Sequence, residues 1–155
     1  MSIAMQHSEQ QAVRLQPVHG LANAAAIDQT PNLTAPRIRE AIAVLFQQGR
    51  IELATAVSEA AITLYPYSED VLVMCALLAE VNQNWETAEQ LLVRLIETQG
   101  NDAPAESWLH LVRVLRCQGK DEDANLICNF TSERFPEHKD LGKEAQELRK
   151  TSAKV

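Results

Sequence analysis

From residue 35 onward, apolar residues recur three and four positions apart, the spacing that places them along one face of an α-helix. The first two stripes lie on either side of 47-QQGR-50, where Gly49 is suited to ending a helix, and the second stripe stops at Pro66. The same plan returns twice, with further helices predicted at 69–82, 85–99, 105–118 and 121–135. The pattern therefore predicts an all-α chain built from three helical hairpins.

A small residue at one fixed register indicates that the hairpins are repeats of one unit. Ala54 and Ala88 are 34 residues apart, and Ala124 follows 36 residues later. The two extra residues fall in the predicted loop around Ala103 and Pro104, where a repeat array tolerates insertions. A small side chain lets two helices approach closely, whereas a large one forces them apart. We therefore expect the three alanines to occupy equivalent helix crossings.

The third unit carries the clearest sequence marks of a known repeat. It reads Trp108-x2-Leu111-Val112-x2-Leu115, then Ala124-x3-Cys128, then Pro136. These marks and the period resemble the tetratricopeptide (TPR) repeat, and the resemblance covers about two thirds of the chain. It implies a right-handed superhelix of three TPR-like hairpins, at residues 35–68, 69–102 and 105–138. The chain departs from the usual pattern at the small position of the first helix, which holds Ile42, Ala76 and Val112.

Segments of a different character lie before and after the repeats. Residues 16–36 hold three prolines and show no helical periodicity, so residues 1–34 are predicted to form a flexible N-terminal leader. Residues 139–155 place the apolar Leu141, Ala145 and Leu148 on one helical face. Because the last repeat of a solenoid exposes a face that must be covered, we expect a C-terminal capping helix and tail there.

The composition narrows the classes of partner and location. The 155 residues carry a net charge of −7, which argues against a nucleic-acid partner because such proteins bind phosphates through Lys and Arg. The longest purely apolar run, residues 71–79, is far shorter than the ~20 residues that span a bilayer, so no membrane partner is expected. The N-terminus lacks a secretory signal, and the three cysteines form no C-x-x-C pair. We therefore expect a cytoplasmic protein.

The chain contains none of the short motifs of serine hydrolases, phosphate-binding loops, dinucleotide sites or zinc proteases. Glu106 and His110 lie four positions apart on one predicted helix face, but two ligands are too few for a zinc site. Cys75 and Cys128 fall at packing positions of the repeat, and no neighbouring base marks Cys117 as a nucleophile. We therefore predict no enzymatic activity, no catalytic residue, no metal and no cofactor.

The TPR resemblance implies a concave groove lined by the first helix of each hairpin. In the second unit this helix includes 71-VLVMCALLA-79, which is apolar on every face, so one face remains after two are packed against neighbours. We therefore expect a protein or peptide partner with hydrophobic anchors. The candidate groove residues are Arg39, Phe46, Val73, Met74, Leu77, Val81, Leu109, Arg113 and Arg116.

Some TPR domains grip the acidic C-termini of chaperones, and the resemblance allows that ligand class to be checked. Those domains use Lys, Asn and Arg at fixed groove positions. The corresponding residues here are Arg39, Ala43, Met74, Glu106 and His110, of which only Arg39 fits. We therefore do not expect an acidic C-terminal peptide as the ligand.

In size, three-repeat layout, acidity and N-terminal extension, the chain resembles the small TPR chaperones of bacterial type III secretion systems. This resemblance implies a non-enzymatic module that keeps an aggregation-prone subunit soluble in the cytoplasm before its export. The alternative is a structural scaffold or assembly subunit, which associates with further copies as a homodimer or larger assembly through the groove or the leader. An enzyme with an unrecognised site is the third hypothesis.

Overall fold

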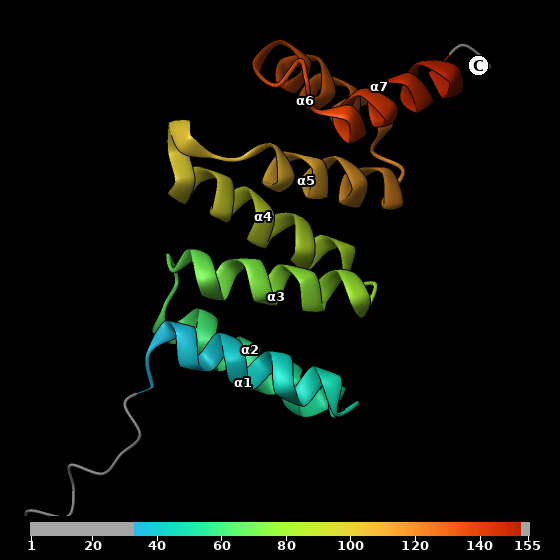
Figure 1. Ribbon diagram of the computed structural model, residues 1–155. Helices are drawn as coiled ribbons and strands as arrows, with labels where there is room; N and C mark the ends of the chain where they lie inside the picture. Colours follow the sequence, from blue (N-terminus) through green and yellow to red (C-terminus); the bar gives the residue numbers. More distant parts are fainter. Residues whose placement is uncertain (1–32, 153–155) are drawn as a thin grey trace, which may run out of the picture. The chain divides into compact units, whose positions relative to one another are not determined.

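The computed structural model describes residues 33–152, which contain seven α-helices, one short 3-10 turn and no strand (Figure 1). The helices are α1 (Ala35–Gln47), α2 (Ile51–Leu64), α3 (Glu69–Val81), α4 (Trp85–Gln99), α5 (Ala105–Cys117), α6 (Asp121–Arg134) and α7 (Lys139–Ser152). The predicted all-α fold is confirmed. Apart from Leu33 and Thr34, the predicted leader lies outside the described residues.

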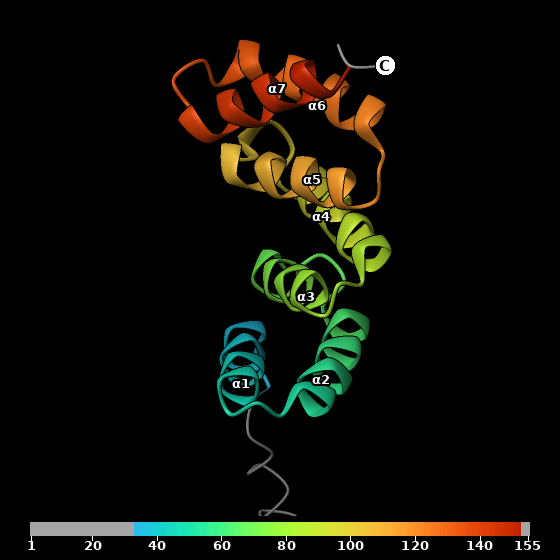
Figure 2. The same cartoon turned by 90° about the vertical axis from the view of Figure 1, so that its right-hand side faces the viewer.

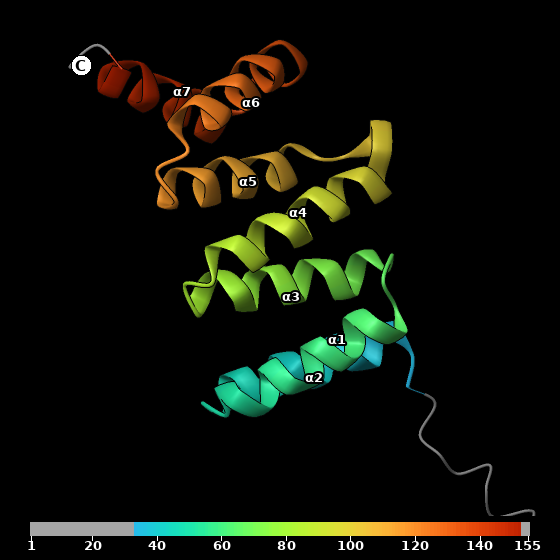
Figure 3. The ribbon, with the colours of Figure 1, turned by 180° about the vertical axis from the view of Figure 1, so that it is seen from behind.

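The helices pack as hairpins that follow one another in chain order. α1 packs against α2, α3 against α4, and α5 against α6. Each second helix also contacts the next first helix, so α2 touches α3, α4 touches α5, and α6 touches α7. Figure 2 shows this order, and α1 lies in front of α2 in Figure 1 and behind it in Figure 3. This packing is that of a helical repeat protein, in which each unit contacts its neighbours.

The three alanines that share one register are fully buried. Ala54, Ala88 and Ala124 each have 0% of their surface exposed. Each lies in the first turn of the second helix of its hairpin, and its N–H donates to the carbonyl four residues earlier over 3.0 Å. A larger side chain at such a close-packed position would push the neighbouring helices apart. The equivalence predicted from the 34- and 36-residue spacings is confirmed.

The turns inside the three hairpins share one backbone geometry. Gly49, Gln83 and Gly119 have positive φ angles of 72°, 57° and 72°. The residue after each of them donates its N–H to the carbonyl five residues earlier at 2.8–2.9 Å, which is the hydrogen bond of a Schellman turn. Glycine adopts this conformation without steric cost, whereas a residue with a Cβ is strained there. The second hairpin therefore makes the same turn with Gln83, whose Cβ makes it less suited to this conformation than glycine.

The connection between the second and third hairpins is longer than the other two. A 3-10 turn, η2 (Gly100–Asp102), follows α4, and the extra residues predicted near Ala103 and Pro104 come directly after it. α1 packs against α3, and α5 packs against α7, whereas α3 and α5 make little direct backbone contact. The insertion therefore accompanies a looser junction between the first helices of the second and third hairpins.

α7 has the position of the first helix of a fourth unit, and no second helix follows it within the described residues. It begins 34 residues after α5 and packs against both α5 and α6. Its apolar residues Leu141, Ala145 and Leu148 are buried. Three positions that are buried in α3 are exposed in α7, where they hold Gly142, Gln146 and Arg149. α7 thus covers the third hairpin and presents polar residues to solvent.

The two cysteines at packing positions are buried, and Cys117 is exposed. Burial raises the pKa of the Cys75 thiol to about 11 and also raises the pKa of Cys128. Both thiols therefore stay neutral near pH 7 and behave as small apolar groups in the core.

Candidate peptide-binding groove

The first helix of each hairpin meets the first helix of the next unit, and we call each such place a junction. The same two positions of the repeat lie at every junction. The first position holds Phe46 in α1, Glu80 in α3 and Arg116 in α5, and the second holds Met74 in α3, His110 in α5 and Glu144 in α7. The steps between them are 34 and 36 residues, as for the buried alanines. The α1–α3, α3–α5 and α5–α7 junctions therefore present three different chemistries at equivalent sites.

The α1–α3 junction is an apolar pocket of about 310 Å³. It is lined by Ile42, Ala43, Phe46 and Gln47 from α1 and by Met74, Leu77, Leu78 and Val81 from α3. Phe46, Leu77 and Val81 stay partly exposed, since none of the other described helices lines this pocket. Apolar side chains gathered in a solvent-accessible hollow are typical of a binding site.

The α3–α5 junction is bridged by a histidine and a carboxylate. Nδ1 of His110 lies 3.0 and 3.2 Å from the two carboxylate oxygens of Glu80, and this contact raises the pKa of His110 above its ordinary value. Beside the pair lies a second hollow of about 220 Å³, whose lining includes Val73, Leu77 and Glu106. Because Leu77 lines both hollows, the second one continues the apolar pocket along α3.

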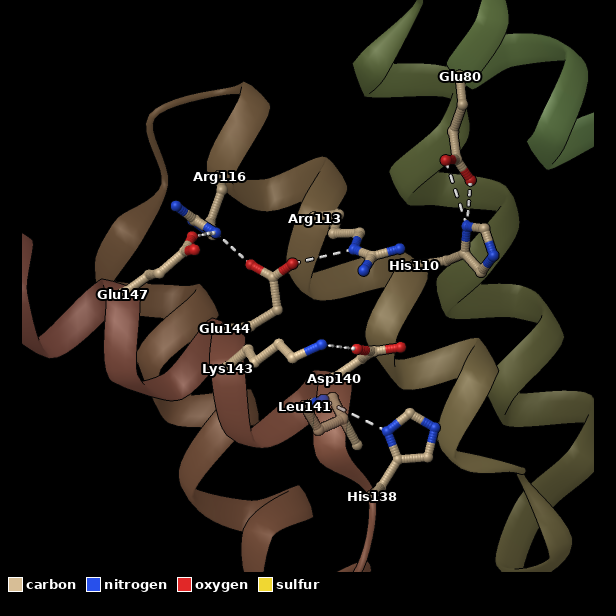
Figure 4. A network of polar contacts seen from close by, with 10 residues as sticks. All are labelled: Glu80, His110, Arg113, Arg116, His138, Asp140, Leu141, Lys143, Glu144 and Glu147. Atoms are coloured by element: carbon tan, nitrogen blue, oxygen red, sulfur yellow. Dashed lines mark hydrogen bonds and ion pairs between the residues drawn. The ribbon is translucent and has the colours of Figure 1, made fainter.

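The α5–α7 junction is bridged by ion pairs, and Arg113, Arg116 and Glu144 also line a hollow of about 540 Å³ there. Nε of Arg113 donates to Glu144 over 2.9 Å, and Arg116 donates to Glu144 and, over 3.0 Å, to Glu147. Figure 4 shows both guanidinium groups directed at carboxylates of α7. Only 12% of the Glu144 side chain is exposed. The two repeat positions that line an open pocket between α1 and α3 are occupied here by side chains that pair with each other.

No protein-family model and no curated protein matches the chain. Among solved structures, the first TPR domain of Spaghetti (RPAP3), bound to the HSP90 peptide SRMEEVD, is similar with a TM-score of 0.65 and 16% sequence identity. The match covers 77% of this chain and 93% of that one. The chain has a TPR fold.

Five of the predicted groove residues lie close together in this TPR fold. Phe46, Met74, Leu77 and Val81 line the α1–α3 pocket, and Val73 lines the second hollow. Arg39 lies outside both linings, and its guanidinium forms an ion pair with Asp70 at 3.2 Å. The apolar residues on α1 and α3 thus form one surface, and Arg39 lies apart from it.

The three predicted groove residues on α5 line neither of these hollows. Leu109 is buried in a cluster with Ala105 and Leu141, because α7 packs against α5 there. Arg113 and Arg116 pair with α7. The open apolar surface is therefore shorter than the sequence predicts, since α7 covers part of α5.

Glu80 is a groove residue that is absent from the candidates predicted by the sequence pattern. Its carboxylate lines the second hollow and pairs with His110. A signal for it was present, because Glu80 lies 34 residues after Phe46 and 36 residues before Arg116, both of which were candidates. A comparison of the same position in all three units therefore identifies it.

Within the described residues, no group of three or more His, Cys, Asp or Glu is placed to hold a metal ion. Glu106 and His110 have different partners, since His110 contacts Glu80 and the Glu106 carboxylate lies 3.7 Å from Nε2 of His138. None of the helices in the described part of the chain is long and apolar enough to cross a membrane.

Proposed function

We propose that the chain is a non-enzymatic binding module that holds an apolar segment of a partner protein between α1 and α3. The observation that carries this proposal is the apolar pocket in which Phe46, Leu77 and Val81 remain partly exposed. Covering apolar surface with a partner is favourable by about 25 cal/mol for each Å² removed from water. The similar TPR domain was solved with a bound peptide, which supports a polypeptide as the class of ligand.

The extent of the groove also favours a polypeptide over a compact small molecule. The pocket continues past Leu77 into the second hollow, where Val73 is 38% exposed. An elongated segment reaches both hollows at once. Peptides bound in this way present apolar anchors at regular intervals, either from an extended chain or from one face of a helix.

The narrower role that we propose is that of a type III secretion chaperone in the cytoplasm. The three-hairpin layout, the net charge of −7 and the apolar groove support this role. In it, the groove covers an apolar segment of a secreted subunit that aggregates when free. The partner identified below is then expected to be a secreted subunit, and a partner of any other kind contradicts the narrower role alone.

The experiment compares the parent chain with two double variants. Val73→Asp with Leu77→Asp places two charges in the groove at side chains that are already 38% and 37% exposed, so the fold is expected to persist. The matched control is Leu126→Asp with Phe130→Asp on the exposed surface of α6. Each variant adds the same charge and removes two apolar side chains.

Partners are captured from native lysate, identified by mass spectrometry, purified and titrated against each chain by calorimetry. We expect the groove variant to bind at least about tenfold more weakly, because an uncompensated carboxylate in an apolar pocket opposes binding. The α6 variant is expected to bind as the parent does, and circular dichroism is expected to show equal helicity in all three chains. An unchanged affinity in the groove variant contradicts the proposal.

A self-associating scaffold is the second candidate function, since a second copy is also able to cover the exposed apolar pocket. Light scattering on the purified chain distinguishes the two. A dimer that Val73→Asp with Leu77→Asp disrupts supports the scaffold, whereas a monomer in the parent supports the binding module.

A further inference from the structure

Three hollows follow α3 from its end to its beginning. The α1–α3 pocket shares Leu77 with the second hollow, which lies between α3, α4 and α5. The second hollow shares Gln99 and Pro104 with a third, of about 450 Å³, near the start of α3. Because neighbouring hollows share lining residues, the three lie in a row along α3, and we call this row the groove.

The lining of this groove changes from apolar to acidic along its length. The α1–α3 pocket has no charged residue in its lining. The second hollow adds Glu80 and Glu106, and the third adds Glu69 and Asp102. The groove therefore has an apolar end at the C-terminus of α3 and an acidic end at its N-terminus.

Two carboxylates at the acidic end are available to a ligand. The Glu106 side chain is 70% exposed, and its carboxylate lies 3.7 Å from Nε2 of His138. Glu69 is also exposed and accepts a hydrogen bond from the neutral amide of Gln99 over 3.1 Å. Of the other acidic residues on α3, Glu80 pairs with His110 and Asp70 pairs with Arg39. The negative charge at this end is thus only partly compensated.

We infer that the segment held in the groove carries an apolar side chain at one end and a basic side chain at the other. This inference rests on the proposed function. The apolar side chain occupies the α1–α3 pocket, and the basic side chain lies against Glu69 and Glu106. Opposite charges across an interface favour encounter and fix the direction of the bound segment. An acidic segment such as the SRMEEVD peptide of the similar TPR domain places like charges against this end and is disfavoured.

The length of α3 sets the spacing between the two side chains. Val81, at the apolar end, follows Glu69 by 12 residues of the same helix, which is about 18 Å. An extended segment spans that distance in about five or six residues. A helical segment needs about twelve residues, or three to four turns.

The test uses blocked synthetic peptides and the full chain, with affinities from fluorescence anisotropy. Each peptide has two leucines at one end and, after a neutral spacer, two lysines, two glutamates or two glutamines at the other. Every peptide is made with the short spacing for an extended segment and the long spacing for a helix. We expect the lysine peptide to bind about tenfold more tightly than the glutamine peptide, and the glutamate peptide to bind most weakly. The preference is expected to shrink as salt is added, because these charges are exposed.

The decisive variant is Glu69→Gln with Glu106→Gln, which removes two charges and keeps the shape of both side chains. It is expected to abolish the preference for the lysine peptide over the glutamine peptide. The matched control is Glu52→Gln with Glu59→Gln on the exposed face of α2, which makes the same change in net charge away from the groove. This control is expected to keep most of the preference.

The outcomes separate this inference from the proposed function. Equal binding of all three peptides, or a preference that both double variants reduce equally, overturns the inference and leaves the apolar pocket in place. Binding that Val73→Asp with Leu77→Asp does not weaken overturns the proposed function itself, as does the absence of binding by every peptide. A peptide that binds only by dissociating a dimer shows that a second copy occupies the groove, which also overturns the inference.

Discussion

The α1–α3 and α5–α7 junctions place opposite kinds of chemistry at the same two repeat positions. Between α5 and α7, Arg116 meets Glu144, and the carboxylate is largely buried. Between α1 and α3, Phe46 and Met74 take these positions and line an open apolar pocket. One junction is thus bridged by the chain itself, while the other presents a surface suited to another polypeptide.

The different needs of the helices explain this difference. α1 and α3 are each held by their own second helix, α2 and α4, and the ion pair between them, Arg39 with Asp70, lies outside the pocket lining. α7 has no second helix of its own in the described part of the chain, and it depends on α5 and α6. Its ion pairs with Arg113 and Arg116 therefore add to the apolar packing that holds it.

The largest expected effect comes from breaking the α5–α7 junction. Glu144→Ala removes the largely buried carboxylate that pairs with the exposed Arg113 and the half-buried Arg116, and leaves Arg116 with Glu147 alone. We expect the free energy of unfolding to fall by about 2–3 kcal/mol, measured by urea denaturation. Hydrogen exchange is expected to increase most in α7. Gln146→Ala, at an exposed position of the same helix, is the control and should change stability little; equal losses in the two variants contradict the account.

The ion pair of the α5–α7 junction can be moved to the α1–α3 junction by two substitutions. Phe46→Arg with Met74→Glu places the α5–α7 chemistry at the α1–α3 junction. We expect binding of the apolar partner to weaken at least about tenfold, because the pocket becomes charged, with a change in stability within about 1 kcal/mol. Calorimetry and urea denaturation measure the two effects. Leu126→Arg with Phe130→Glu on α6 is the matched control, and a loss of binding there equal to that of the transplant refutes the assignment of the pocket.

The pair of His110 and Glu80 at the α3–α5 junction is expected to make the stability of the fold depend on pH. Contact with Glu80 raises the pKa of His110 in the folded chain, so protons bind the folded state more tightly than the unfolded one. The pair therefore stabilises the fold fully below the ordinary histidine pKa of 6.5, and this contribution is lost as the pH rises through the higher folded-state value. The parent is expected to be more stable than His110→Gln near pH 5, with the difference shrinking toward about pH 8 in urea titrations.

The charged groups around His110 provide the control for this pH dependence. Glu80 on α3 raises its pKa, and Arg113 on α5 opposes that effect. When Glu80→Gln is already present, the stability change caused by His110→Gln is expected to lose its decline with pH. A parent whose advantage over His110→Gln grows as the pH rises would show that the sign is wrong.

The smallest expected effect concerns the turn of the second hairpin. Gln83 has a φ of 57° where the first and third hairpins have glycine, so Gln83→Gly is expected to raise the free energy of unfolding by up to about 1 kcal/mol. The reverse change, Gly49→Gln, is expected to cost a similar amount. A Cβ at Gly49 meets no atom within 4 Å, so any loss reflects the backbone alone. Thermal unfolding measures both, and a loss of stability in Gln83→Gly contradicts the shared turn.

The repeat spacing made most of the fold predictable. The register of Ala54, Ala88 and Ala124 and the turn glycines identify the hairpins, because each repeat has to bury the same small residue and make the same turn. The exposed apolar surface of α3 was also predictable. A helix that is apolar on every face has more apolar surface than its neighbouring helices cover. These are local properties of the sequence.

The extent of the groove was less predictable, because it depends on where α7 packs. The apolar stripe of α7 indicates a helix that packs against a neighbour. It does not indicate that Glu144 reaches Arg113 and Arg116 on α5. For the same reason the burial of Leu109 beside Leu141 does not follow from the pattern of α5 alone. Contacts between side chains distant in the sequence decide these points.

The methyl group of Met74 reports directly on whether a partner binds between α1 and α3. Met74 lines the pocket, and the chain has only two other methionines, Met1 and Met5, so methyl-labelled methionine gives a simple NMR spectrum. During titration with the partner segment, the Met74 resonance is expected to shift with the dissociation constant that calorimetry gives. A Met74 resonance that stays unchanged while the partner binds would contradict the account.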